Sequence, residues 1–155
     1  MSAEERGITA DERQRPLSGD PARQAILAEQ RQRVEELAAA CAVDEHALLV
    51  ELRDHQIHVT SVWDFVASGG APPRAVPILV AHLSRDHHER IWEGIVRALA
   101  VDHARGQALA ALSELYRRET DRSRRSTLAH AIGAMARLDE VADLPEIESH
   151  RSLFR

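Results

Sequence analysis

The stretch of the chain best equipped for chemistry is RDHHERIWEG, which runs from Arg85 to Gly94. At its centre are His87, His88 and Glu89, and imidazole and carboxylate groups are common ligands of transition metals. The same letters also fit the polar first turn of a helix. Asp86 is a residue type that caps helix N-termini, and Glu89, three residues later, completes a pair that resembles a capping box. A metal site needs further ligands from elsewhere in the chain, whereas a helix start needs none.

The other histidines do not supply such ligands. The chain has nine histidines, and no two of them lie four residues apart in one predicted helix, as they do in the HExxH zinc motif. His55 and His58 flank Ile57 in a predicted loop, without an evident third ligand. The one cysteine, Cys41, has no CxxC partner and lies on the apolar side of a helical pattern, which predicts a buried structural thiol. No catalytic triad, phosphate loop or EF-hand pattern can be recognised either, so we expect no catalysis, no metal and no cofactor.

Composition indicates a soluble all-α protein. The 155 residues are 44% hydrophobic and 29% charged, but only 3% aromatic. Such a chain favours helix packing over strands, which prefer aromatic and β-branched side chains. The net charge is −5, and all 20 basic residues are Arg, interspersed with acids. A dedicated nucleic-acid binder would carry a basic surplus. The N-terminus has no hydrophobic signal region and no 18-residue apolar run exists, so we expect a cytoplasmic protein without a membrane span.

The first third of the chain predicts a tail followed by two helices. Residues 1–19 have no periodicity and are predicted to form a mobile tail. Asp20 and Pro21 are a good helix start. The helix predicted from there to about residue 41 has an apolar side that consists of Leu27, Val34, Leu37, Ala38 and Cys41. A second, shorter helix is predicted from Asp44.

A brief third helix is predicted before a glycine stop. Ser61 and Asp64 form a capping-box pattern that opens this helix, and Gly69-Gly70 terminates it. Trp63 and Phe65 are expected to help seal this end of the core.

The remaining helices form two copies of one unit. Helices are predicted after Pro72-Pro73, then over residues 87–100, 104–118 and 123–137. The segment AVPILVAHLSR, from residue 75, aligns with QALAALSELYR at an offset of 32 residues, and IWEGIVRALA, from residue 91, aligns with LAHAIGAMAR at an offset of 37. A repeated helix pair with a period in the thirties is typical of an α-solenoid, in which each pair covers the apolar side of its neighbour.

Over residues 71–145 the chain resembles the HEAT-repeat family, through PRAVPILVAHL…ERIWEGIVRALA and ALAALSELYRRE…RSTLAHAIGAMA. It is most similar to small bacterial HEAT-repeat proteins that carry a short helical region before the first repeat. The resemblance implies an α-α superhelix, a short solenoid of helix pairs that binds protein partners and sometimes nucleic acid. Some HEAT-repeat enzymes hold two irons through repeated His-Glu dipeptides. Here His88-Glu89 is the only such dipeptide, and the equivalent positions in the second repeat are Arg125 and Ser126.

These observations predict one helical domain over residues 20–155. It comprises an N-terminal cap (20–70), HEAT-like repeat 1 (71–100), repeat 2 (104–137) and a partial third repeat or C-terminal cap (138–155), whose open edge allows homo-oligomers. We expect a non-catalytic module that binds another protein through a concave face, and the resemblance suggests an immunity protein that neutralises a toxin. The alternatives are a nucleic-acid-binding protein and, third, a metal-dependent enzyme that uses His87, His88 and Glu89. The expected partner-binding residues are Glu89, Arg90, Glu93, Arg97, Arg124, Arg125, His130 and Arg137.

Overall fold

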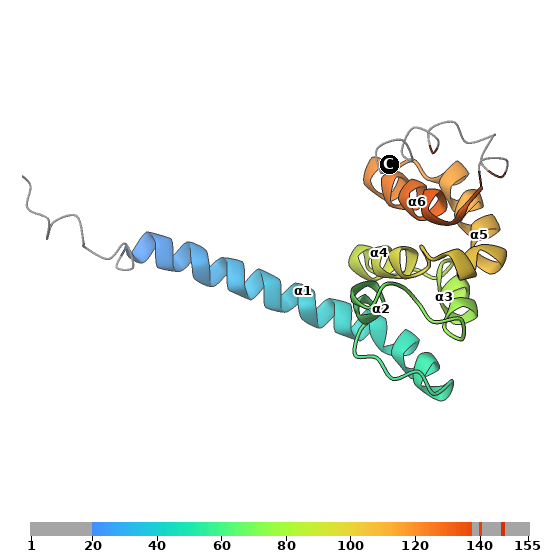
Figure 1. The fold of residues 1–155 in the computed structure, drawn as a ribbon. Coiled ribbons are helices and arrows are strands. Elements are labelled where there is room, and N and C mark those ends of the chain that lie inside the picture. The colour runs from blue at the N-terminus through green and yellow to red at the C-terminus, as the bar shows by residue number, and fades with distance from the viewer. Residues whose placement is uncertain (1–19, 138–139, 141–146, 148–155) are drawn as a thin grey trace, which may run out of the picture. The chain divides into compact units, whose positions relative to one another are not determined.

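The computed structural model describes residues 20–137, Glu140 and Ile147, and every regular element over these residues is helical (Figure 1). The elements are α1 (Pro21–Asp54), α2 (Trp63–Ala67), α3 (Val76–His82), α4 (Glu89–Ala98), the 3-10 turn η3 (Asp102–Ala104), α5 (Arg105–Arg118) and α6 (Arg122–Met135). The all-α prediction is therefore confirmed for this part of the chain. The predicted tail over residues 1–19 and most of the predicted third repeat over 138–155 lie outside the described residues.

The chain divides into two compact units, Met1–Ala39 and Ala40–Arg155. In the first unit, the predicted helix start is confirmed. The Asp20 side chain accepts a hydrogen bond from the backbone N–H of Ala22 at 3.0 Å, and the Asp20 carbonyl accepts one from Gln24. Pro21 occupies the first helical position, where a missing N–H costs nothing.

Helix α1 corrects two expectations. The helix does not end between residues 41 and 44, where a second helix was predicted to begin. The residues between them, Ala42 and Val43, are not helix breakers as Gly or Pro would be, so α1 continues for 34 residues. In the first unit, the predicted apolar side of the helix does not face the hydrophobic core. Leu27, Val34 and Leu37 are 42%, 66% and 44% exposed, whereas Cys41, in the second unit, is buried. Periodicity identifies which side chains share a face, but not whether anything covers that face.

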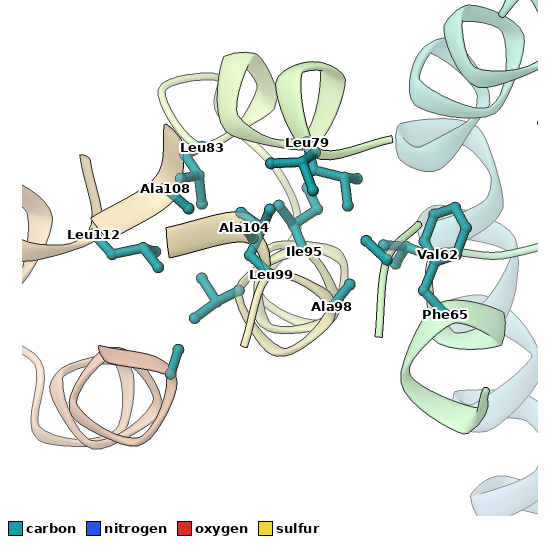
Figure 2. Close-up of a cluster of buried hydrophobic side chains, with 14 of the residues drawn as sticks. Val62, Phe65, Leu79, Leu83, Ile95, Ala98, Leu99, Ala104, Ala108 and Leu112 are labelled. Atoms are coloured by element: carbon teal, nitrogen blue, oxygen red, sulfur yellow. The ribbon is translucent and has the colours of Figure 1, made fainter. Parts of the chain in front are cut away.

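The second unit holds the hydrophobic core. Within it α2 packs on α4, α3 on α5, α4 on α6, and α5 on α6. Figure 2 shows side chains of α2, α3, α4 and α5 meeting in this core, among them Phe65, Leu79, Ile95 and Leu112. The aligned positions of the two predicted repeats behave alike. Three residues of α4 and their α6 counterparts are all buried: Ile91 and Leu128, Ile95 and Ile132, Ala98 and Met135.

The short helix α2 begins and ends as the sequence predicts. The Asp64 carboxylate accepts hydrogen bonds from the backbone N–H groups of Thr60 and Ser61, and the Ser61 hydroxyl accepts one from Trp63, which reproduces most of a capping box. After the helix, Gly69 and Gly70 adopt φ of +94° and +125°. Such values suit glycine, and the Gly70 N–H closes the turn onto the Phe65 carbonyl at 2.7 Å.

Gly94 marks the closest approach of α4 to α2. A Cβ at this position would lie 2.6 Å from Val62 Cγ1 and 3.1 Å from Trp63 Nε1. Gly106, by contrast, is a helical glycine of α5 with no heavy atom within 4 Å of a Cβ built on it. Substitution of Gly94 by Ala would therefore change both packing and helix propensity, whereas substitution of Gly106 by Ala would change helix propensity alone.

We predict that Gly94→Ala lowers the free energy of unfolding by about 1–3 kcal/mol, because overpacking outweighs the gain in helix propensity. Gly106→Ala is the matched control and should raise it by about 0.5–1 kcal/mol. Urea denaturation followed by circular dichroism measures both. A Gly94→Ala variant at least as stable as wild type would contradict the close approach.

Candidate functional site

A chain of polar side chains, in which two buried imidazoles lie between two partly exposed carboxylates, joins α1 to the end of α3 and the loop that follows it. Glu51 Oε2 lies 2.8 Å from His82 Nε2, and His82 Nδ1 lies 2.9 Å from His87 Nε2. His87 Nδ1 in turn lies 3.1 Å from Asp44 Oδ2. The two imidazole rings stack with their centroids 5.1 Å apart. Asp44 and Glu51 are seven residues apart, which places both carboxylates on one side of α1. We refer to Asp44, Glu51, His82 and His87 as the histidine bridge.

Two contacts compete for His82 Nε2. This nitrogen lies 2.8 Å from the Glu51 carboxylate, which can only accept, and 2.8 Å from Arg85 Nη1, which can only donate. Nε2 therefore donates to Glu51 when it is protonated and accepts from Arg85 when it is not. In the second case His82 donates from Nδ1 to His87 Nε2, and His87 donates from Nδ1 to Asp44. The tautomer thus decides which of the two contacts is a hydrogen bond.

The surroundings of His82 favour the neutral ring. The side chain is 0% exposed. Burial lowers the pKa of His82 below its ordinary value, and the neighbouring charges of Arg85 and His87 act in the same direction, although Glu51 opposes them. The pKa of Glu51 is also lowered, chiefly by its contact with His82 and further by the Arg85 guanidinium, which lies 3.3 Å away. The histidine bridge therefore places a neutral, buried imidazole beside an ionised carboxylate.

The bridge geometry is that of hydrogen bonds rather than of metal ligands. Two nitrogens bound to one tetrahedral zinc would be about 3.3 Å apart, given Zn–N bonds of about 2 Å, and would both point at the ion. In the bridge, His82 Nδ1 and His87 Nε2 face each other at 2.9 Å. Across the described residues, no three His, Cys, Asp or Glu side chains are grouped so that they could hold a metal ion.

The three residues of the predicted metal alternative point in different directions. His87 belongs to the histidine bridge. His88 Nδ1 accepts a hydrogen bond from the backbone N–H of Arg90 and lies 3.5 Å from the buried Cys41 thiol. Glu89 forms an ion pair with Arg124 at 3.4 Å. The structure therefore does not bring His87, His88 and Glu89 together, and the buried position predicted for Cys41 is confirmed.

The predicted N-cap of α4 was wrong. His88, rather than Asp86, caps the helix, and α4 begins at Glu89. The cause is a contact that lies 44 residues away in sequence: Asp44 Oδ2 accepts the backbone N–H of His88 at 2.9 Å as well as facing His87. Asp44 thus holds the loop before α4 in an extended conformation that moves the helix start two residues onward.

The predicted partner-binding residues lie mainly on the exposed sides of α4 and α6. On α4, Glu93 and Arg97 form an ion pair at 2.8 Å, and the Arg90 guanidinium lies over the Trp63 ring at 5.2 Å. The Glu89–Arg124 ion pair connects α4 to α6. His130 is exposed on α6, and the backbone N–H of Arg137, beyond the end of α6, donates to Glu140. We call the exposed side chains Glu89, Arg90, Arg97 and His130, with the partly exposed Glu93 and Arg124, the α4–α6 face.

Two of the predicted arginines have structural contacts of their own. The Arg124 guanidinium lies 4.0 Å from the centre of the Trp92 ring and also reaches Glu119 at 3.5 Å. The Arg125 guanidinium lies 4.2 Å from the centre of the Tyr116 ring and donates to the carbonyls of Tyr116 and Glu119. Each is only partly exposed. Both cations are therefore committed to rings and acceptors within the second unit.

Sequence reasoning missed the polar anchors of α1. Besides Asp44 and Glu51, the buried Glu45 accepts hydrogen bonds from the Ser61 hydroxyl and the Val62 N–H, which fixes the start of α2. Together with Cys41, Leu48 and Leu52, these acids recur at helical spacing along one side of α1. The sequence did contain a signal for these anchors, because the acids lie within an otherwise apolar side of the helix. A carboxylate at such a position needs a polar partner in the core.

Comparisons with protein-family models, with curated proteins and with solved structures gave no match. Among the described residues, no helix combines the length and the apolar character that crossing a membrane requires.

We predict that the free energy of unfolding falls as the pH drops below about 6.5, the ordinary pKa of histidine. The sign follows from the lowered pKa of His82: the unfolded chain takes up a proton there before the folded chain does. His82→Gln should reduce the slope by up to about 1.4 kcal/mol per pH unit between pH 6.5 and 5. Glu51 titrates below this window, since its pKa is lowered from 4.5.

Denaturation at a series of pH values measures this slope, and His46→Gln, at an exposed position of α1, is the matched control. It should leave the slope unchanged. An equal slope in wild type and His82→Gln would contradict the buried neutral imidazole.

We also expect elemental analysis of the purified protein to find no stoichiometric iron or zinc, because His87, His88 and Glu89 do not converge. Stoichiometric metal that is lost on His88→Gln would overturn this expectation.

Proposed function

We propose that this chain is a non-catalytic protein-binding module that recognises its partner through the α4–α6 face. The observation that carries the proposal is the Glu89–Arg124 ion pair, which joins the exposed charges of α4 and α6 into one surface. Glu93 and Arg97 extend that surface along α4. Its acids and bases alternate, and mixed charge of this kind suits a protein partner with complementary charges.

The arrangement behind this face supports a short HEAT-like solenoid. The first helices of the two predicted repeats, α3 and α5, pack on each other, and so do the second helices, α4 and α6. Equivalent positions of α4 and α6 are buried alike, as expected where successive helix pairs cover one another. In such a stack the second helices form one continuous side, which is the side we assign to the partner.

The contacts of the arginines favour a protein partner over nucleic acid. Phosphate binding needs cations that are free to reach the backbone. Arg124 and Arg125 instead lie over Trp92 and Tyr116, and Glu89 and Glu93 add negative charge to the same face.

The histidine bridge favours binding over catalysis. The His82 side chain is 0% exposed, and the His87 side chain is 4% exposed. A general base must come within hydrogen-bond reach of its substrate, and these rings are occupied by Glu51, Arg85 and Asp44. The immunity role that the resemblance implies is a special case of this proposal, in which the partner is a toxin.

A charge swap on α4 tests the proposal. Glu93→Arg with Arg97→Glu keeps the net charge and an i, i+4 ion pair, but inverts the pattern of the face. The matched control is Glu114→Arg with Arg118→Glu, which inverts an exposed i, i+4 pair on α5. Both variants should remain as stable as wild type within about 0.5 kcal/mol.

Quantitative affinity capture from a lysate of the source organism compares the three proteins. We expect a specific protein to be retained by wild type and by the α5 variant and to be depleted on the α4 variant. Equal retention by all three would exclude the α4–α6 face, and retention of nucleic acid instead of protein would favour the alternative function.

A further inference from the structure

The N-terminal half of α1 carries large apolar side chains that are exposed. Ile26, Leu27, Val34 and Leu37 are 56%, 42%, 66% and 44% exposed. We call these four residues the α1 row. Scattered surface leucines are ordinary, but these recur on one side of a single helix. Leu27, Val34 and Leu37 are spaced by seven and three residues, which is the a, a, d spacing of a coiled coil.

The surface along the α1 row has the shape that a coiled coil uses. A shallow hollow is lined by Leu27, Gln30, Arg31, Val34 and Glu35. The first four are residues i, i+3, i+4 and i+7, the set that surrounds one inserted side chain in knobs-into-holes packing. The hollow therefore matches the seat for an apolar side chain of a second helix.

The charged residues at the two positions that flank the apolar seam of the α1 row are of one sign. At 100° per residue, Arg31 borders the row on one side and Arg33 on the other. These are the e and g positions, and over residues 24–40 the e and g positions are Gln24, Ile26, Arg31, Arg33, Ala38 and Ala40, with no acid among them. Glu35, at a b position, touches the edge of the hollow, and Glu29 and Glu36 lie further round the helix.

Existing contacts on α1 leave the flanking charges available at little cost. Arg33 forms an ion pair with Glu29 within the helix, but the two side chains are 73% and 63% exposed. Such a surface pair contributes little and exchanges readily for another carboxylate. Gln32 and Glu36 are joined by a hydrogen bond on the side of the helix away from the row, so they support the helix without covering it.

We propose that residues 24–38 of α1 are a docking site for an amphipathic helix of a partner protein, whose apolar seam is flanked by Asp or Glu. The partner's apolar side chains pack on the α1 row and into the hollow, and its carboxylates pair with Arg31 and Arg33. A second copy of this chain is a poorer occupant, because its own e and g positions offer no carboxylate. The site shares no residue with the α4–α6 face, and its proposal does not depend on that face.

The probe is a labelled three-heptad helical peptide with Leu and Val at a and d and Glu at e and g, titrated with the full chain. A peptide with Lys at e and g is the comparison. We expect saturable binding of the acidic peptide that weakens with salt, and binding of the basic peptide that is weaker on the order of tenfold or more.

Variants locate the site. Val34→Gln with Leu37→Gln should weaken binding of the acidic peptide on the order of tenfold or more, because both seam residues are lost. Val43→Gln is the matched control, since Val43 is a 79% exposed apolar residue of the same helix on the opposite side. It should leave binding unchanged, as should the Glu93→Arg, Arg97→Glu swap. Arg31→Glu with Arg33→Glu should reverse the preference toward the basic peptide.

Several results would overturn the proposal. These are no saturable binding of the acidic peptide, equal binding of both peptides, and equal effects of the Val34/Leu37 and Val43 variants. Sedimentation equilibrium of the chain alone gives a further test. If the chain forms a dimer, and Val34→Gln with Leu37→Gln dissociates it, the α1 row binds a second copy of the chain and the proposal is overturned.

Discussion

The second unit depends on the contact between two acids of α1 and two buried imidazoles. Asp44 and Glu51 on α1 hold the end of α3 and the loop before α4 through His82, His87 and the His88 backbone. Burying the two imidazole rings costs free energy unless their nitrogens find partners, and the two acids supply such partners. The contacts of Asp44 with His87 and with the His88 backbone set the course of the loop and the residue at which α4 begins. The position of α4 then determines which of its side chains meet α2 and α6.

The polar contacts do not replace the hydrophobic core but orient it. The core includes the fully or almost fully buried side chains Leu48, Leu52, Ile91, Ile95 and Leu128, which contribute apolar area to the stability of the unit. Apolar contact alone would tolerate small rotations of a helix about its axis. Carboxylates with specified partners do not, because a rotated helix would carry the acids away from the buried imidazoles. Glu45 plays the same part for α2 through Ser61 and Val62.

Local signals predicted local structure well. Asp20-Pro21 started α1, Ser61 and Asp64 opened α2, Gly69-Gly70 closed it, and the apolar periodicity of α4, α5 and α6 placed these helices within about two residues. Three features were wrong or missed, and only the first could have been read from the sequence letters. The continuity of α1 follows from the lack of a helix breaker, the His88 cap from a carboxylate 44 residues away, and the exposure of Leu27 and Val34 from the absence of any described covering element. The predicted binding residues were placed on a common face in part, but two of the arginines proved to be occupied.

Those arginines have a consequence for how the second unit meets water. Trp63, Trp92 and Tyr116, three of the largest side chains of this unit, each lie beneath a guanidinium group. The flat faces of guanidinium are weakly hydrated, whereas its N–H edge is strongly polar. A guanidinium group placed over a ring covers the ring with its weakly hydrated face and presents its N–H edge to water. The aromatic rings can then fill the outer layer of the core without becoming adhesive patches, and a lysine, whose charge is a compact hydrated point, could not seal them in the same way.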